Sequence, residues 1–473
     1  MEEKLVRGLG LLGLVATGVC TVIGGGINVL TVMIQREVPG VMLYVPHAFL
    51  LGAIPAIFSA LTFCILSSAM PKAGGSYIYI SRGLSPFFGF IATFSQWVGL
   101  ITAVGVIAYA KMFLLADAFH QIRLGEAALR SNVCMIGIPL LIIWLSWLLN
   151  VLGIKIYEKM MIILMFLMFL GGIVLIFTGF FSSKEEFIQA LLRKEEFGFS
   201  QLPYISSDKV NLANLLRAAA VLFFAYLGFD ALAQAGEESK RASYNLPLAF
   251  IISAGIIIIY YGLFSFAIYN AIPWQYISYK AEISKITAPG LMAILWPKSL
   301  AFFILLMAAL ALANDIPPLQ LATSRLIYAW TKDGIFPQSF GRVCKRFKTP
   351  DRALTLGAIV SSIVVIECHF HGFFLGADLA TIALLFTYFL VAIAVLTLPY
   401  KNPIIYKNTH FIKNDKVKRG ISIIASLLIF LLLIILIEKD PIWKYDIFSS
   451  SLFLWAISLF FGASIFFYHK RKV

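Results

Sequence analysis

Twelve long apolar stretches constrain the fold of this 473-residue chain more than any other feature. A helix needs about 20 mostly apolar residues to cross a bilayer, and each stretch approaches or exceeds that length. The composition agrees, since 60% of the residues are hydrophobic and 13% are charged, against about 45–50% and about 25% in globular chains. The sequence therefore predicts an all-α integral membrane protein with 12 transmembrane helices, and it excludes a soluble enzyme, a secreted disulfide scaffold and a disordered chain. The stretches are 10–35, 44–69, 86–117, 133–150, 157–182, 211–236, 247–271, 299–330, 354–371, 377–399, 419–437 and 449–468.

The basic residues gather in alternate connecting segments. The chain holds 38 Lys and Arg against 24 Asp and Glu, a surplus that in a soluble protein would suggest nucleic-acid binding. Here the segments 332–352 and 401–419 and the carboxyl-terminal tail are rich in Lys and Arg, while the segments on the other side are nearly balanced. Because basic residues favour cytoplasmic loops, we expect a multi-pass protein of the cell membrane with both termini in the cytoplasm. Its expected surroundings are the lipid bilayer, and no nucleic-acid partner is expected. The first stretch exceeds the apolar core of a signal peptide and is expected to stay in the protein.

Two interrupted helices at matching positions indicate an internal repeat. Gly24-Gly25-Gly26 interrupts the first apolar stretch, and Gly228 lies within the sixth. Each begins a set of five helices, and because five is odd, the second set is inverted relative to the first. We expect a first repeat over 8–182, an inverted second repeat over 211–400, and two further helices over 419–468. Interrupted helices in two inverted halves are the sequence sign of a transporter's midplane binding site.

The interruptions would expose backbone groups that can bind a charged solute. A glycine costs a helix about 1 kcal/mol relative to alanine, and unpaired backbone groups persist in a membrane only where protein or a wet cavity satisfies them. Amide N–H groups at the start of a half-helix attract an anion, and the carbonyls that end the preceding half-helix attract a cation. A zwitterion with a carboxylate and an ammonium on one carbon fits both. Close helix packing through small residues is the alternative explanation.

Five motifs, in the expected order, resemble the amino acid–polyamine–organocation (APC) superfamily over about four hundred residues. They are the glycine motif at 22–27, the segment 71–79, the break at 224–230, Glu237-Glu238 with Pro247, and 324–328 followed by 332–337. The resemblance implies a LeuT-like fold and secondary transport of amino acids or related amines.

The resemblance also implies a substrate site at the two interruptions. Backbone amides would hold the α-carboxylate, backbone carbonyls would hold the α-amine, and the ring of Phe224 would cover the substrate. The amides are those of Gly24, Gly25, Gly26 and Ile27, the carbonyls are those of Val22, Phe224 and Leu227, and Gly228 belongs to the same expected site.

Few ionisable residues lie inside the predicted helices, and each is a functional candidate. The resemblance gives Asp230 a proton-sensing or gate-coupling role; alternatively, it only accepts hydrogen bonds from unwound backbone. Asn314 and Asp315 precede a proline pair that should kink the eighth helix. They could bind Na⁺, carry a proton, pair with a basic substrate side chain, or satisfy backbone loosened by the prolines. Lys111, about 37 Å along the third helix, is expected to reach the outer surface beside Asp117.

The sequence favours a secondary active transporter of amino acids that works by alternating access, either proton-coupled or as an exchanger. A transporter of polyamines, other organic amines or inorganic cations on the same scaffold is the alternative. A membrane enzyme would need clustered histidines, cysteines or carboxylates, whereas the six histidines are dispersed. No phosphate-binding loop is present, and neither a cofactor nor a metal site is predicted; Cys368, His369 and His371 are interpreted as residues near a helix end.

Overall fold

A computed structural model describes residues 5–122, 129, 131–193, 211–284, 286–371, 374–439 and 450–470. These residues form helices joined by turns, and strand-like pairing among them is limited to isolated bridges between Leu9 and Ser239 and between Ala73 and Ala235. The prediction of an all-α chain is confirmed for this part of the protein.

Eleven helical segments in the described part are long and apolar enough to cross a membrane. They match eleven of the twelve predicted stretches in order. The segments are α1 (Leu11–Val22) with α2 (Gly25–Glu37), α3 (Val45–Ala69), α5 (Pro86–Ile122), α7 (Asn132–Val151), α8 (Ile154–Phe181), α10 (Leu212–Leu222) with η3 (Phe223–Tyr226) and α11 (Ala231–Gln234), α12 (Ala242–Ala271), α17 (Asp351–His371), α18 (Phe374–Lys401), α20 (Asp415–Lys439) and α21 (Ser451–Lys470).

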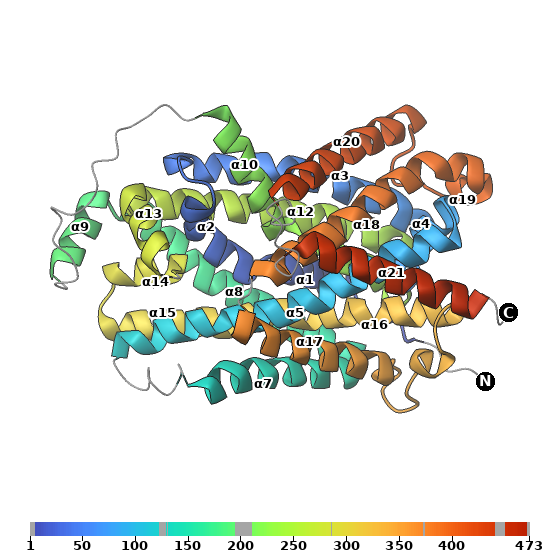
Figure 1. Ribbon diagram of the computed structural model, residues 1–473, viewed down its shortest axis with the longest axis horizontal. Helices are drawn as coiled ribbons and strands as arrows, with labels where there is room; N and C mark the ends of the chain where they lie inside the picture. The colour runs from blue at the N-terminus through green and yellow to red at the C-terminus, as the bar shows by residue number, and fades with distance from the viewer. Residues whose placement is uncertain are drawn as a thin grey trace.

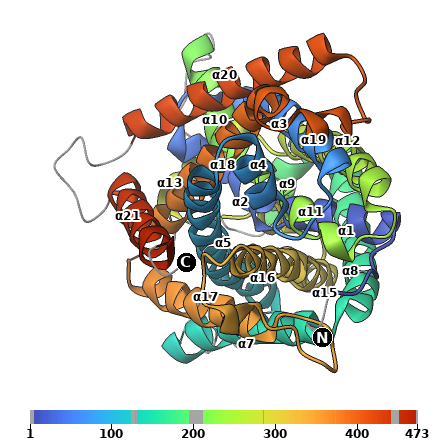
Figure 2. The ribbon, with the colours of Figure 1, turned by 90° about the vertical axis from the view of Figure 1, so that its right-hand side faces the viewer.

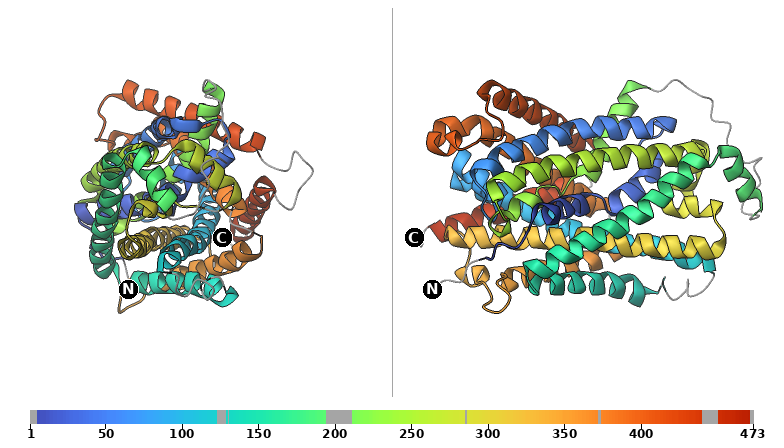
Figure 3. Two further views of the ribbon diagram at one scale, coloured as in Figure 1. Left: turned by 90° about the vertical axis from the view of Figure 1, so that its left-hand side faces the viewer. Right: turned by 180° about the vertical axis from the view of Figure 1, so that it is seen from behind.

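The stretch predicted as the eighth helix is divided. It comprises α15 (Lys298–Ala311), the 3₁₀ turn η6 (Leu312–Asp315) and α16 (Ile316–Lys332), which follow one another along one line (Figures 1 and 3). The division falls where Pro317 and Pro318 enter the first turn of α16, a place where a missing N–H is tolerated because it would have no intrahelical acceptor. α15 has 14 residues and α16 has 17, so each falls short of the about 20 residues typical of a membrane-spanning helix, and a count of 12 remains a prediction.

Burial separates central helices from peripheral ones. Within an apolar 18-residue stretch of each segment, 83% of the residues are buried in α1–α2 and 76% in α5, but only 17% in α7 and 17% in α21. Seen along the bundle, α7, α20 and α21 lie at its periphery (Figure 2). The first interrupted helix and α5 therefore form the interior, and the outer helices present apolar side chains to the membrane.

α8 shows how one apolar helix serves both surroundings. Met161, Met165 and Met168 are buried against the bundle, while Phe166 and Leu170 are exposed. Residues three or four positions apart share a helix face, so one face packs inward and the other faces outward. A helix that is apolar all round is typical of a membrane protein.

The described chain begins and ends at the same end of the bundle (Figure 1). We call this the terminal end. It also holds α4 (Gly75–Gly83), α19 (Pro403–Lys407) and η7 (Gln338–Gly341), whereas α9 (Lys184–Arg193), α13 (Trp274–Ile283) and α14 (Ala288–Met292) lie at the opposite end (Figure 1).

Candidate substrate site

The first helix is interrupted at Ile23 and Gly24, a shorter break than the three consecutive glycines suggest. α1 ends at Val22, and Gly24 has φ −144° and ψ −138°, which is not helical. Gly25 and Gly26 lie in the first turn of α2, where backbone N–H groups have no intrahelical acceptor. The amides that the sequence singled out are thus at the amino-terminal end of a half-helix, as an anion site requires.

The sixth helix is interrupted between η3 and α11. Gly228 has φ +112°, a conformation that favours glycine, and a Cβ atom at this position would lie 2.8 Å from Thr21 Cγ2. This close approach shows that the two interruptions lie against each other. The N–H of Leu227 donates to the carbonyl of Phe224 at 3.1 Å, so the carbonyl oxygen can accept one further hydrogen bond.

Tyr261 of α12 joins the two interruptions. Its hydroxyl oxygen lies 2.7 Å from the carbonyl oxygen of Val22 and 2.8 Å from that of Ala225. Because a phenol carries one hydrogen, it can donate to only one of the two carbonyls at a time. No spacing in the sequence distinguishes this tyrosine from its neighbour Tyr260, so the sequence could not identify it.

A small pocket lies between the two interruptions. The residues predicted to form the substrate site line it, except Ile27. Of the three predicted coupling residues, Asp315 lines it, and Asp230 and Asn314 do not. Its walls are mainly apolar, and Asp315 is the ionisable residue among them. The lining residues are Thr21, Val22, Gly24, Gly25, Gly26, Ala103, Ile107, Phe224, Ala225, Leu227, Gly228, Asp315, Leu319, Ala380 and Leu384.

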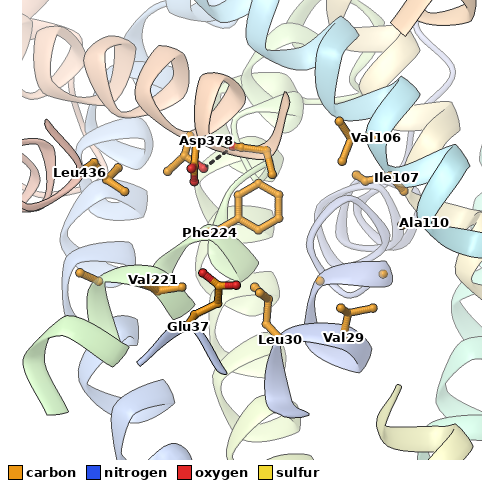
Figure 4. A pocket seen from close by; sticks show the side chains of 15 residues that line it. Val29, Leu30, Glu37, Val106, Ile107, Ala110, Val221, Phe224, Asp378 and Leu436 are labelled. Atoms are coloured by element: carbon orange, nitrogen blue, oxygen red, sulfur yellow. Dashed lines mark hydrogen bonds between the residues drawn. The ribbon is translucent and has the colours of Figure 1, made fainter. Parts of the chain in front are cut away.

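A second pocket continues from the first along α2. The two share Gly25, Gly26, Ile107 and Phe224, and the second reaches Glu37, the last residue of α2. Phe224, Glu37 and Asp378 all line this second pocket (Figure 4). The central pocket is therefore continued toward the opposite end of the bundle, with Phe224 where the two pockets meet.

Lys111 is placed differently from the sequence prediction. Its ammonium lies 2.6 Å from Asp315 Oδ1, and the side chains of Lys111 and Asp315 are 1% and 2% exposed. The prediction that Lys111 reaches the surface is therefore wrong; the side chain of Asp117, its expected neighbour, lies outside the described residues. The prediction measured the depth of Lys111 in the membrane from Pro86, as if the helix began at the membrane surface. α5 has 37 residues, about 55 Å at 1.5 Å per residue, so its ends extend beyond a core of about 30 Å.

A helical pattern could have placed Lys111 correctly. Ala103, Ile107 and Lys111 are four residues apart and share one face of α5. Ala103 and Ile107 line the central pocket, so Lys111 lies one turn further along the same face. Lys111 is the one basic Lys or Arg side chain in the third apolar stretch, and Asp315 is the one carboxylate in the eighth. This also indicated that the two could pair.

Asp315 connects Lys111 to the first interruption. Its second oxygen, Oδ2, accepts a hydrogen bond of 3.3 Å from the N–H of Gly25. A Cβ atom on Gly24 would collide with the same oxygen, so the absence of a side chain at position 24 is what allows the carboxylate to approach. The neighbouring Asn314 donates to the carbonyl of Ile23 at 3.2 Å, and its own side-chain oxygen is buried without a hydrogen-bond partner. Asn314 and Asp315 thus both contact the first interruption.

Asp230 lies in a separate hydrogen-bond network. It is fully buried, and Gln96 of α5 and Tyr388 of α18 donate to its two carboxylate oxygens. The hydroxyl of Tyr388 also accepts a hydrogen bond of 3.2 Å from the N–H of Gly228. The structure therefore brings Asp230 close to the second interruption through neutral side chains, and it does not bring Asp230 into the central pocket.

Buried contacts between distant segments hold the terminal end of the bundle together. Arg325 of α16 and Glu238 form a buried pair with two hydrogen bonds, Nε to Oε2 at 2.8 Å and an Nη atom to Oε1 at 2.6 Å. The carbonyl of Glu238 accepts from the N–H groups of Gly8 and Leu9 at 2.8 and 3.0 Å. The segment before α1 is thereby fixed to η4 (Gly236–Glu238) and through it to α16.

A second group of contacts lies at the same end and borders a pocket that Tyr77, Arg82 and Asp333 help to line. The carboxylate of Asp333 accepts hydrogen bonds from Tyr77 at 2.7 Å and from Arg82 at 3.3 Å. Burial, together with the neighbouring Asp333 carboxylate, raises the pKa of Tyr77 above its usual range. The phenol therefore remains a donor at physiological pH. Arg325 and Asp333, which lie in the motif segments 324–328 and 332–337, both take part in these contacts.

Comparison with known proteins gives an independent result. A family model described as "Amino acid permease" matches residues 9–467. The chain is similar to the branched-chain amino acid permease BcaP of Bacillus subtilis (strain 168), with 25% identity over 85% of this chain and 83% of that protein. It is also similar to the vacuolar cationic amino acid transporter 4 of Arabidopsis thaliana, with 26% identity over 85% of this chain and 64% of that protein. The glutamate/serine transporter AimA of Bacillus subtilis (strain 168) is 23% identical over 99% of this chain and 83% of its own length.

Proposed function

The chain belongs to the amino acid permease family of the APC superfamily, a family of multi-pass membrane transporters, and from this membership we propose that it moves amino acids across the cell membrane by alternating access. One observation carries the proposal: a pocket bounded by the first-turn amides of α2 and by the break in the sixth helix. The substrate's carboxylate would bind at Gly25 and its neighbours, and its ammonium would bind at the carbonyls that end α1 and η3. Phe224 would act as the gate above it.

We propose an apolar side chain for the preferred substrate. The part of the central pocket away from the two interruptions is built from Ala103, Ile107, Leu319, Ala380 and Leu384. Asp315, the carboxylate that lines it, is already paired with Lys111. An apolar side chain would therefore be buried without leaving an unpaired charge, which is the costly alternative in a dry pocket.

The closed terminal end and the pocket that continues toward the opposite end suggest the direction of access. In the proposed cycle this conformation would admit substrate from the opposite end, and separation of Arg325 from Glu238 would open the terminal end. We place the terminal end in the cytoplasm on the basis of the basic segments 332–352 and 401–419. The proposal includes the LeuT-like arrangement of two inverted five-helix repeats followed by two helices, with α15 and α16 counted as one transmembrane helix.

For energy coupling, we propose proton symport through Asp230, with substrate exchange as the alternative. The partners of Asp230, Gln96 and Tyr388, are neutral. They hydrogen-bond the carboxylate without neutralising its charge, whereas Asp315 has a lysine within 2.6 Å. A proton on Asp230 would remove the buried charge and would act on the second interruption through Tyr388 and Gly228. Asn314 and Asp315, with Na⁺ as the ion, remain the alternative coupling site.

A second candidate function is supported by the acidic wall of the outer pocket. Glu37 and Asp378 are the charged residues that line it (Figure 4). Glu37 already pairs with Arg36 at 3.2 Å, and a cationic solute, which carboxylates attract, would have to compete with that arginine. Under this alternative the substrate would be a cationic amino acid, a polyamine or another organic amine.

The test is uptake by the purified full-length protein in proteoliposomes, with leucine, lysine, glutamate and spermidine as labelled solutes and with imposed proton or sodium gradients. We expect leucine uptake to exceed uptake of the other three and to depend on the proton gradient in the wild type but not in Asp230→Asn. Preferred uptake of lysine or spermidine would support the second candidate. Uptake of none of the four would contradict the proposal.

A further inference from the structure

The pocket beside Asp333 offers groups of both charges to one ligand. It lies at the terminal end between α4, the start of α5, the turn after α16 and the end of α21 (Figure 2). Its volume of about 530 Å³ is within the range of small-molecule sites. Arg82, Ser85 and Asp333 line it. The guanidinium of Arg82 lies 3.3 Å from the carboxylate of Asp333, so a ligand that meets one of these charges is also near the other.

These polar groups have hydrogen-bonding capacity beyond their contacts within the protein. Tyr77 and Arg82 both donate to Oδ2 of Asp333, and no donor among the described residues contacts Oδ1. Arg82 uses one of its five guanidinium N–H groups in this contact. The hydroxyl oxygen of Ser85 accepts from the N–H of Phe88 at 3.3 Å, and its hydrogen can donate to a ligand. The pocket therefore combines an acceptor for a cation with donors for an anion.

One wall of the pocket is aromatic and continues onto the exposed surface of the bundle. Phe87 and Phe466 line the pocket, with ring centroids 5.3 Å apart. The rings of Phe88 and Phe467 pack against Phe87 and are themselves exposed. Because α21 lies at the periphery of the bundle (Figure 2), this wall faces the membrane. A lipid could therefore place its head group in the pocket and its acyl chains along these rings.

We propose that this pocket binds a phospholipid whose head group carries a primary ammonium, namely phosphatidylethanolamine, from the leaflet at the terminal end. The phosphate accepts hydrogen bonds from Arg82 and Ser85, and the ammonium donates to Oδ1 of Asp333. Phosphate, guanidinium, carboxylate and ammonium then alternate in sign. The contact between Arg82 and Asp333 is therefore kept, and both charges of the head group are paired.

Two related lipids lack one feature that the proposed site recognises. The ammonium of phosphatidylethanolamine has three N–H donors, whereas the trimethylated nitrogen of phosphatidylcholine has the same charge and no donor. Phosphatidylglycerol has the phosphate but no cation, so it would bring an unpaired anion near Asp333, which is repulsive. The site should therefore prefer phosphatidylethanolamine to both. This preference does not depend on which solute the protein transports.

The experiment is native mass spectrometry of the purified full-length protein in detergent, titrated separately with the three lipids carrying identical acyl chains. We expect the first bound phosphatidylethanolamine to have a roughly tenfold lower dissociation constant than either other lipid, the difference made by one hydrogen bond to a charged group. Equal binding of phosphatidylethanolamine and phosphatidylcholine, or tighter binding of phosphatidylglycerol, would overturn the proposal. Equally tight binding of water-soluble phosphoethanolamine would show that the ligand is not a lipid.

Substitution of the acidic residue should remove the preference. In Asp333→Asn we expect the affinity for phosphatidylethanolamine to fall roughly tenfold, to the level of phosphatidylcholine, whose own affinity should change little. Asp415→Asn is the matched control, because Asp415 also accepts from a tyrosine and a basic residue, Tyr406 and Lys418, but does not line this pocket. It should leave all three affinities unchanged. If Asp333→Asn keeps the wild-type preference, the proposal is wrong.

Substitution of the phosphate donors should weaken all three lipids, because each contains the phosphate. We expect a loss of roughly tenfold in Arg82→Gln and of roughly threefold in Ser85→Ala. Ser85→Ala leaves the contact between Arg82 and Asp333 intact, so it keeps the test valid if the variants that change a charge fold poorly. Unchanged affinities in both donor variants would overturn the proposal.

Discussion

Gly24 and Gly25, neighbours at the first interruption, lack a side chain for different structural reasons. A side chain at Gly24 would collide with Asp315, whereas a Cβ atom on Gly25 would have no heavy atom within 4 Å. Gly24 is thus required by the close approach of a carboxylate, and Gly25 borders the open space of the pocket. The sequence presents them as equal members of one motif, and their neighbours in space distinguish them.

This difference predicts the effect of Gly25→Leu. The Cβ atom would enter open space and the rest of the side chain would occupy the pocket, so we expect leucine uptake in proteoliposomes to fall at least about tenfold with little change in melting temperature. Gly255→Leu is the matched control, since Gly255 lies on the exposed face of α12 and also has nothing within 4 Å. Normal uptake by Gly25→Leu would contradict the site assignment.

At the scale of elements, the closure of the terminal end depends on segments far apart in the chain. The segment before α1, η4 and α16 meet at Glu238, whose carboxylate binds Arg325 and whose carbonyl binds Gly8 and Leu9. Such a junction can open only if a buried ion pair separates, which makes the pair a natural control point for the proposed conformational cycle.

We predict that Arg325→Met favours the conformation open at the terminal end. It leaves the Glu238 carboxylate buried and unpaired, a cost of about 3–5 kcal/mol that opening would relieve by hydration. The measurement is the rate at which a polar thiol reagent labels Ser76→Cys in a background without the five native cysteines. The parent Ser76 side chain is buried at this end and accepts a hydrogen bond from Gln234.

Labelling should be faster in Arg325→Met than with Arg325 present. The double variant Glu238→Gln/Arg325→Met removes the unpaired charge and provides the control, with labelling closer to that of the parent. Equal rates in all three proteins would show that the pair does not hold the terminal end closed.

At the scale of the whole molecule, the bundle has two chemically different ends. The basic segments 332–352 and 401–419 are at the terminal end, while α9 lies at the opposite end (Figure 1). Positive charge favours the cytoplasmic side, so the proposed orientation places the terminal end in the cytoplasm.

This orientation predicts which ends react in intact cells. In a background without native cysteines, Lys184→Cys in α9 should react with a membrane-impermeant thiol reagent in intact cells, and Lys345→Cys should react only after permeabilisation. Both parent side chains are exposed, so access to the reagent depends on the membrane alone. The reverse pattern would invert the proposed topology.

The sequence by itself determined the properties that depend on local order along the chain. Apolar length predicts the helices, and glycines at 24–26 and 228 mark the interruptions. Charge distribution predicts orientation, and the ordered motifs indicate the superfamily that the family match then showed. Each of these signals is contained within one segment, so no knowledge of tertiary contacts is needed to recognise it.

Only the tertiary structure decided which side chains meet. Lys111 and Asp315 are 204 residues apart, and Asp230 and Tyr388 are 158 apart; no periodicity within a single helix specifies such pairs. Lys111 was misplaced because its depth depends on how far α5 extends beyond the membrane core, and Tyr261 was missed because its role depends on two carbonyls from other helices. Electrostatic and hydrogen-bonding partners are properties of distance in space, and packing of the helices sets that distance.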